Sequence, residues 1–192
     1  NRGKALDINI AANTIWGIAV VKSIRAGIVY NLQGKIDLAF RESSEAMQIA
    51  EESGDILSKA HSYTHHGASC CCKGYLREAE EYLVKGIDFA ERIKDASVLS
   101  WDYFWLIETC LSMGKHVQAR EATERVISLL EQQKILPSGL NLARLALALA
   151  KIMGGDVNIE LERLYGYAAT SKMKTFEGWM QRLLSAILLN ID

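Results

Sequence analysis

Apolar positions along this chain recur at steps of three and four residues, which is the spacing of an amphipathic α-helix. One typical stretch has apolar residues at positions 76, 79, 83, 87 and 90. No strand-like alternation competes with this pattern, so it predicts an all-α protein. The predicted helices span residues 15–33, 36–53, 56–73, 76–93, 97–113, 117–134, 138–153, 157–171 and 175–190.

The helical pattern repeats every 40 residues. The repeated positions are a glycine followed five residues later by an alanine, namely Gly34, Gly74, Gly114, Ala39, Ala79 and Ala119. We expect each glycine to close the first helix of a pair in a left-handed conformation, and each alanine to let the second helix approach closely. Between pairs, Gly54–Asp55 and Lys94–Asp95 are predicted turns, with each aspartate capping the next helix. A fourth, degenerate unit follows at Gly154.

This pattern resembles the tetratricopeptide repeat (TPR) family. The resemblance rests on small residues in the first helix (Gly27, Gly67), the turn glycines and the second-helix alanines, and it covers residues 15–134 well and 138–190 poorly. The unit is longer than the usual ~34 residues, and the proline that follows the second helix is missing except for Pro137. Longer units of this kind are similar to those of Leu-Gly-Asn-rich polarity adaptors and of arrays in bacterial ATPase, cyclase and transcription-activator proteins. The resemblance implies a right-handed superhelical array of antiparallel helix pairs.

The repeat register predicts one repeat domain over residues 1–192. It consists of a half-unit at 1–12, helix pairs at 15–55, 56–95, 97–135 and 138–173, and a half-unit at 175–192. Repeat arrays need terminal units with polar outer faces, and Ile187, Leu188, Leu189 and Ile191 stand near the end of the sequence instead. We therefore expect a fragment of a longer protein.

The resemblance also implies a concave groove lined by first-helix residues that lie 13, 10, 6 and 3 positions before each turn glycine. The first set is Val21, Ile24, Ile28 and Asn31, and Ala68 and Ala148 belong to later sets. The candidate partner contacts are His61, Thr64, Cys71, Trp101, Phe104, Glu108, Leu111, Asn141, Arg144 and Lys151. Aromatic anchors near a guanidinium are typical of binding hot spots. Two alternatives stay open: the aromatics pack between repeats, and Arg144 and Lys151 are simply solvated.

The composition of the chain excludes several classes of partner and location. With 22 basic and 23 acidic residues the net charge is −1, which gives no broad basic face for nucleic acid or an anionic membrane. The most apolar run, from Leu140 to Met153, is interrupted by Arg144 and Lys151 and is too short to span a bilayer.

The cysteines at 70, 71, 72 and 110 lack the spacing of a disulfide framework, and no secretory signal is visible. We therefore expect reduced thiols and a cytoplasmic protein.

One cluster has residue types that could carry chemistry: His61, His65, His66, Cys70, Cys71 and Cys72. Core packing is the leading interpretation, because buried free thiols behave as small hydrophobes. The alternatives are groove lining, a soft-metal site, and a Cys70 nucleophile with His66 as its base. Phosphate-loop, zinc and nucleophile-elbow motifs are absent from the sequence. We expect no enzyme activity, no metal and no cofactor.

The sequence thus predicts a non-catalytic scaffold in a larger signalling or regulatory protein. Its partner would be a protein, a peptide or a neighbouring domain of the same chain, held in the groove. An alternative is a small-molecule-sensing region that controls an attached catalytic or DNA-binding domain. A third possibility is self-association through the apolar segment 175–192.

Overall fold

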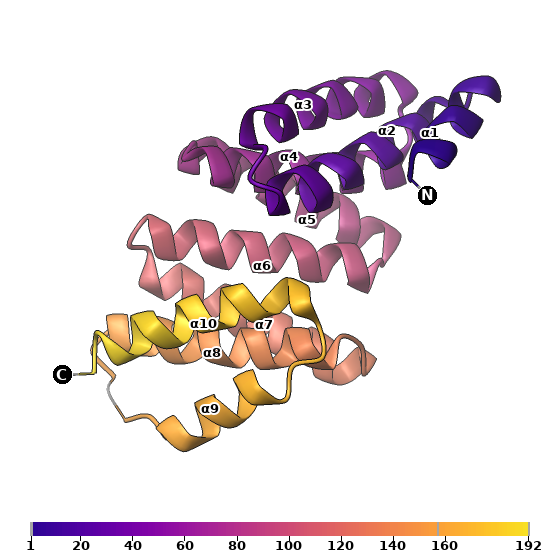
Figure 1. Cartoon of the computed structure of the whole chain (residues 1–192). Coiled ribbons are helices and arrows are strands. Elements are labelled where there is room, and N and C mark those ends of the chain that lie inside the picture. Colours follow the sequence, from indigo (N-terminus) through magenta and orange to yellow (C-terminus); the bar gives the residue numbers. More distant parts are fainter. Residues whose placement is uncertain (1, 157, 192) are drawn as a thin grey trace. The chain divides into compact units, whose positions relative to one another are not determined.

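A computed structural model describes residues 2–156 and 158–191 of the chain (Figure 1). Within those ranges it contains ten α-helices, one π-helical segment and no β-strand. The all-α prediction is therefore confirmed. The helices are α1 (Arg2–Ala11), α2 (Ile15–Ile24), α3 (Ile36–Ser53), α4 (Ile56–Lys73), α5 (Leu76–Ile93), α6 (Ala96–Ser112), α7 (His116–Gln133), α8 (Pro137–Met153), α9 (Leu161–Ala169) and α10 (Lys174–Leu188), and the π-helical segment η1 covers Arg25–Tyr30.

Six of the nine predicted helices, α3 to α8, begin and end within one residue of the predicted bounds. Two predictions need correction. The helix expected over 15–33 changes at Arg25 from α-helical to π-helical hydrogen bonding. The helix expected over 157–171 is only Leu161–Ala169, and residue 157 lies outside the described residues.

The predicted turns between helices are confirmed in the first three units. Gly34, Gly74 and Gly114 have φ values of 71°, 84° and 71°, in the left-handed region that glycine tolerates best. After α3 and α5 the side chains of Asp55 and Asp95 accept backbone hydrogen bonds from the next helix, at 2.7 Å from Ser58 N and at 3.0 Å from Val98 N. These caps explain why the helix ends could be predicted closely.

The fourth unit is shifted by one residue relative to the prediction. Gly154 has φ −88°, and the left-handed residue is Gly155 with φ 91°. The hydrogen bonds agree: Tyr75 N bonds to Cys70 O across Gly74, and Asp156 N bonds to Lys151 O across Gly155. Gly155 is therefore the equivalent of Gly74. Groove positions counted back from Gly154 are wrong by one residue, which is a rotation of about 100° around α8.

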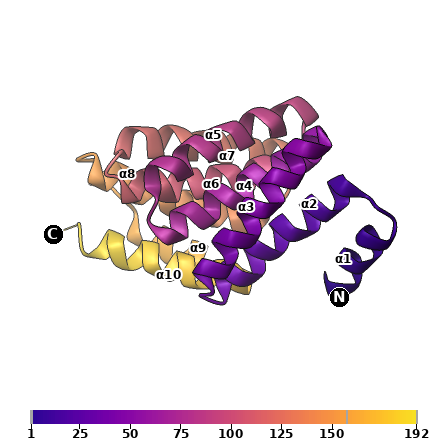
Figure 2. The same ribbon diagram turned by 90° about the horizontal axis from the view of Figure 1, so that it is seen from above.

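The chain divides into two compact units, residues 1–105 and 106–192. In the first unit, consecutive helices from α1 to α5 pack against one another, and α2 also contacts α4. Figures 1 and 2 show α2 and α3 side by side. Small residues allow this packing, since Ala39, Ala46, Ala60 and Ala79 are completely buried. Residues 96–105 of α6 complete this unit, with Val98 packed against Ala60 and Ala90.

In the second unit α8 is the central helix, in contact with α7, α9 and α10. The apolar side of α10 is buried, with Phe176, Met180 and Ile187 at most 1% exposed. Burial of each such side chain stabilises the unit by roughly 1.5–3 kcal/mol. Leu188 and Leu189 remain exposed, and self-association through the segment 175–192 stays a prediction. None of the described helices combines the length and apolarity needed to cross a membrane.

Candidate functional site

The first unit contains a hollow of about 200 Å³ between three helical elements. We call it the first-unit pocket. Its walls come from α2 and η1, from the middle of α4 and from the first turns of α6. Its lining residues are Ile24, Ile28, His61, Thr64, His65, Ser97, Val98 and Trp101. Five of these eight, namely Ile24, Ile28, His61, Thr64 and Trp101, occupy the predicted groove positions.

A close helix contact shapes this pocket. The His65 ring lies directly on Gly27 of η1, where an added Cβ would come within 2.2 Å of His65 Nδ1. Only glycine leaves room for that ring, so the predicted small residue at 27 is required for η1 to lie against α4. The His61 ring stacks on His65 with 6.2 Å between the ring centroids and an interplanar angle of 22°. The two rings thereby form one wall of the pocket.

No carboxylate, lysine or arginine lines the first-unit pocket. Burial lowers the pKa of His61 below its usual value, only partly opposed by Asp95, so the ring carries no proton charge near pH 7. The other lining groups are aliphatic side chains, hydroxyls, the His65 imidazole and the Trp101 indole, and none of them is a carboxylate, a lysine or an arginine. Thr64 is 1% exposed and donates its hydroxyl proton to Ala60 O at 2.7 Å. The pocket therefore offers apolar and aromatic contacts rather than charge.

The other predicted residues of the first unit support this pocket or lie beside it. Phe104 is buried and meets the Trp101 ring edge to face, with 6.0 Å between centroids. It is thus part of the core that holds Trp101, as the packing alternative expected. Cys71 is half-buried on the last turn of α4 and does not line the pocket.

Three of the six residues of the histidine and cysteine cluster, His65, His66 and Cys70, are buried in the core. His66 and Cys70 are almost fully buried, which confirms the core-packing interpretation for both. Burial lowers the pKa of His66 to about 4 and raises that of Cys70 to about 12, so the ring is neutral and the thiol protonated at pH 7. His66 Nδ1 lies 2.9 Å from Ser43 Oγ, which fixes the ring between helices. Within the described residues, no three histidine, cysteine or acidic side chains are placed to share a metal ion.

The second unit contains a larger hollow of about 440 Å³, which we call the second-unit pocket. It lies among the end of α7, the middle of α8, and α9 with the residues just before it. Its lining residues are Ile127, Glu131, Arg144, Leu147, Ala148, Lys151, Asn158, Ile159, Glu160, Arg163, Leu164 and Tyr167. Two of the predicted contacts, Arg144 and Lys151, therefore lie here.

Aromatic and ionic contacts organise this pocket. Arg144 Nη2 lies 3.0 Å from Glu131 Oε1, and its guanidinium lies over the Tyr167 ring at 5.1 Å from the centroid. Arg163 approaches the same ring at 5.9 Å and lies 3.8 Å from Glu160. The Tyr167 ring thus lies within cation–π distance of two guanidinium groups. No pattern in the sequence indicated this tyrosine, because it belongs to the unit where the repeat is degenerate.

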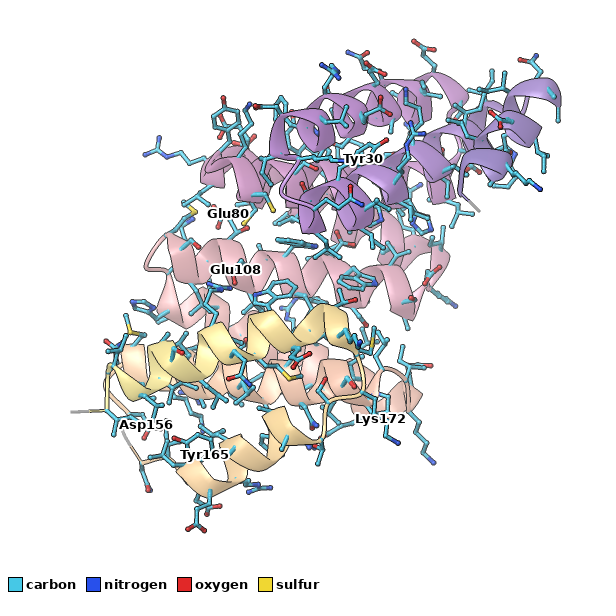
Figure 3. All side chains as sticks on the ribbon, viewed as in Figure 1. Tyr30, Glu80, Glu108, Asp156, Tyr165 and Lys172 are labelled. Atoms are coloured by element: carbon cyan, nitrogen blue, oxygen red, sulfur yellow. The ribbon has the colours of Figure 1, made fainter. Side chains whose placement is uncertain are left out.

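The remaining predicted residues make contacts within the second unit. Glu108 lies on α6 (Figure 3). It accepts a hydrogen bond from Trp179 Nε1 at 2.9 Å and an ion-paired hydrogen bond from Arg182, and both of these residues belong to α10. Asn141 donates to Tyr167 O and to Thr170 Oγ1 at 3.2 and 3.0 Å. Leu111 packs against the cluster of Cys110, Ala119 and Ala150.

The one-residue shift at Gly155 explains the placement in α8. Counting back from Gly155 puts Leu142, Leu145, Leu149 and Ile152 at the groove positions, and all four are buried. Asn141, Arg144 and Lys151 therefore do not share the repeat positions of His61 and Trp101. Their role as partner contacts stays a prediction, separate from the first-unit pocket.

Comparison with known proteins adds no assignment. No protein-family model matches the chain, and a search of curated proteins finds no match either.

Proposed function

We propose that this protein is a non-catalytic, TPR-like recognition module that binds a peptide or a helix of a protein partner. In this proposal the helix pairs form a right-handed superhelical array within a larger regulatory protein. One observation carries it: predicted groove residues of three successive first helices converge on the first-unit pocket. Ile24, His61 and Trp101 come from distant parts of the sequence, and their shared surface depends on the repeat.

The size and polarity of the first-unit pocket indicate the chemistry of the partner. Its volume of about 200 Å³ is below the ~300–1,000 Å³ of typical small-molecule sites. It therefore suits one large apolar or aromatic side chain projecting from a peptide. Because His61 is neutral and no carboxylate, lysine or arginine lines the pocket, an acidic or basic anchor would lose hydration without finding a permanently charged partner.

A peptide selection tests this proposal. Phage-displayed random 16-residue peptides are selected on the folded protein, and one selected peptide is synthesised for calorimetry. We expect a single large apolar anchor whose replacement by alanine removes most of the binding. Trp101→Ala in the protein should weaken binding at least tenfold, as expected of an aromatic hot spot.

Trp16 provides the matched control. It is a tryptophan of the same unit, 48% exposed, and it does not line the pocket. Trp16→Ala should leave peptide affinity within twofold of the original protein. Equal losses in the two variants, or no loss in a well-folded Trp101→Ala, would reject the first-unit pocket as the recognition site.

A further inference from the structure

We propose that the second-unit pocket binds a small organic monoanion, namely a carboxylate attached to an apolar or aromatic body. This site is independent of the first-unit pocket, and it would give the module a small-molecule ligand in addition to a protein partner. The proposal rests on the charge balance of the walls, on the pairing of each charge, and on the apolar surface beside them.

The walls carry one positive charge in excess. Three cationic side chains, Arg144, Lys151 and Arg163, face two carboxylates, Glu131 and Glu160. Glu131 is engaged by Arg144 at 3.0 Å, and Glu160 lies 3.8 Å from Arg163. Among the described residues Lys151 has no carboxylate partner. A ligand with one negative charge would therefore balance the charges of the pocket wall and give Lys151 an anionic partner.

The same pairing argues against a cationic ligand. Both wall carboxylates already have a guanidinium partner, so a cation would have to displace Arg144 or Arg163 and would face Lys151 unshielded. A carboxylate beside Lys151 meets no such cost, and the Arg163 side chain, which is 67% exposed, can turn toward it from its 3.8 Å contact with Glu160. Charge-assisted hydrogen bonds from an ammonium and a guanidinium are the usual means of holding such a group.

The rest of the pocket suits the body of the ligand. Leu147, Ile159 and Leu164 supply apolar surface, and Tyr167 supplies an aromatic ring close to both arginines. The volume of about 440 Å³ lies within the ~300–1,000 Å³ range of small-molecule sites. A ligand with a short apolar chain or one ring would therefore cover these side chains while its carboxylate reaches Lys151.

Titration with two matched compounds tests the proposal. The probes are 4-phenylbutyrate and its uncharged amide, 4-phenylbutanamide, followed by amide chemical shifts of the full chain in NMR spectra. We expect saturable shifts at Lys151, Arg163 and Tyr167 with millimolar affinity, a typical value for a small fragment, and at least tenfold weaker binding of the amide. Phenyl phosphate, which is largely dianionic at neutral pH, should bind no more tightly than the carboxylate.

Variants complete the test. Lys151→Met and Arg163→Met should each weaken 4-phenylbutyrate binding at least tenfold, whereas Lys174→Met, an exposed lysine on α10, should leave it unchanged. The proposal is overturned by equal affinities for carboxylate and amide, by tighter binding of phenyl phosphate, by shifts located elsewhere, or by full binding in both pocket variants. Failure here leaves peptide binding at the first-unit pocket untouched, so the two proposals can be judged separately.

Discussion

Gly86 of α5 and Asp102 of α6 form a matched pair in the core of the first unit. A Cβ added at Gly86 would lie 2.4 Å from Asp102 Oδ1, and the Asp102 side chain is fully buried. The preceding repeat places Ala46 and Ser62 at the equivalent positions, 40 residues earlier, where Ser62 Oγ donates to Ala46 O at 3.4 Å. A larger buried side chain on one helix is thus accompanied by a smaller residue on the other.

Gly86→Ala should destabilise the protein despite the better helix propensity of alanine. Relief of glycine's backbone entropy is worth roughly 0.5–1 kcal/mol, but overpacking against a buried group costs about 1–3 kcal/mol. Chemical denaturation should therefore show a net loss. Adding Asp102→Ser recreates the Ala46 and Ser62 arrangement and should restore at least the original stability. A double variant no more stable than Gly86→Ala alone would contradict the paired-packing explanation.

Asp102 should make stability fall as pH rises. Burial raises the pKa of this carboxyl well above its usual value, an effect that Thr64 offsets only in part, so the folded protein keeps the proton while the unfolded chain loses it. The unfolded state is therefore favoured progressively above pH ~4. Asp102→Asn removes this contribution. Urea denaturation should show that the free energy of unfolding of Asp102→Asn exceeds that of the original protein most at pH 8, and that the difference shrinks toward pH 4. A difference that does not change with pH would contradict this role of Asp102.

His66 should act in the opposite direction. Burial lowers its pKa from 6.5 to about 4, so below pH 6.5 the unfolded chain binds a proton that the folded protein does not. Stability is retained above pH 6.5 and should fall by about 3 kcal/mol as pH drops to 4. His66→Gln should lose this dependence. An NMR titration in which the His66 ring protonates near pH 6.5 would contradict the expectation.

Glu108 should hold α10 in the second unit. Its side chain is 14% exposed and accepts from both Trp179 and Arg182. Because Arg182 is more than half exposed, we expect Glu108→Gln to cost only roughly 1 kcal/mol. Hydrogen exchange across α10 should accelerate accordingly. The control is Glu177→Gln, an exposed glutamate on α10 itself, and equal acceleration in both variants would show that Glu108 has no special role.

The helices could be predicted because their ends are chemically marked. Left-handed glycines at 34, 74 and 114 and the capping Asp55 and Asp95 coincide with changes in the apolar pattern. Around α9 these marks are missing. Because residues 154 and 155 are both glycine, the sequence pattern does not decide which of them takes the left-handed conformation that ends α8. In addition, no side-chain hydrogen bond caps the start of α9.

The residues of the first-unit pocket could be placed from the sequence for the same reason, and those of the second-unit pocket could not. Ile24, His61 and Trp101 could be placed together because their three helices share one register. The second-unit pocket depends on Tyr167 and on the rotation of α8, which is determined by packing among α7, α8 and α9. A one-residue ambiguity at a helix end rotates every side chain by about 100°, so the sequence pattern alone could not place Arg144.

In the function we propose, an apolar anchor of a peptide partner enters the first-unit pocket. The most direct measurement is a set of intermolecular nuclear Overhauser effects between a selected peptide and protein labelled at isoleucine methyl groups. We expect contacts from one apolar side chain of the peptide to the methyl groups of Ile24 and Ile28 and to the Trp101 ring. These contacts should be lost when Ser97→Phe puts a large side chain at the exposed Ser97 position of the pocket wall. Contacts confined to other isoleucines, or unchanged contacts in a folded Ser97→Phe variant, would contradict it.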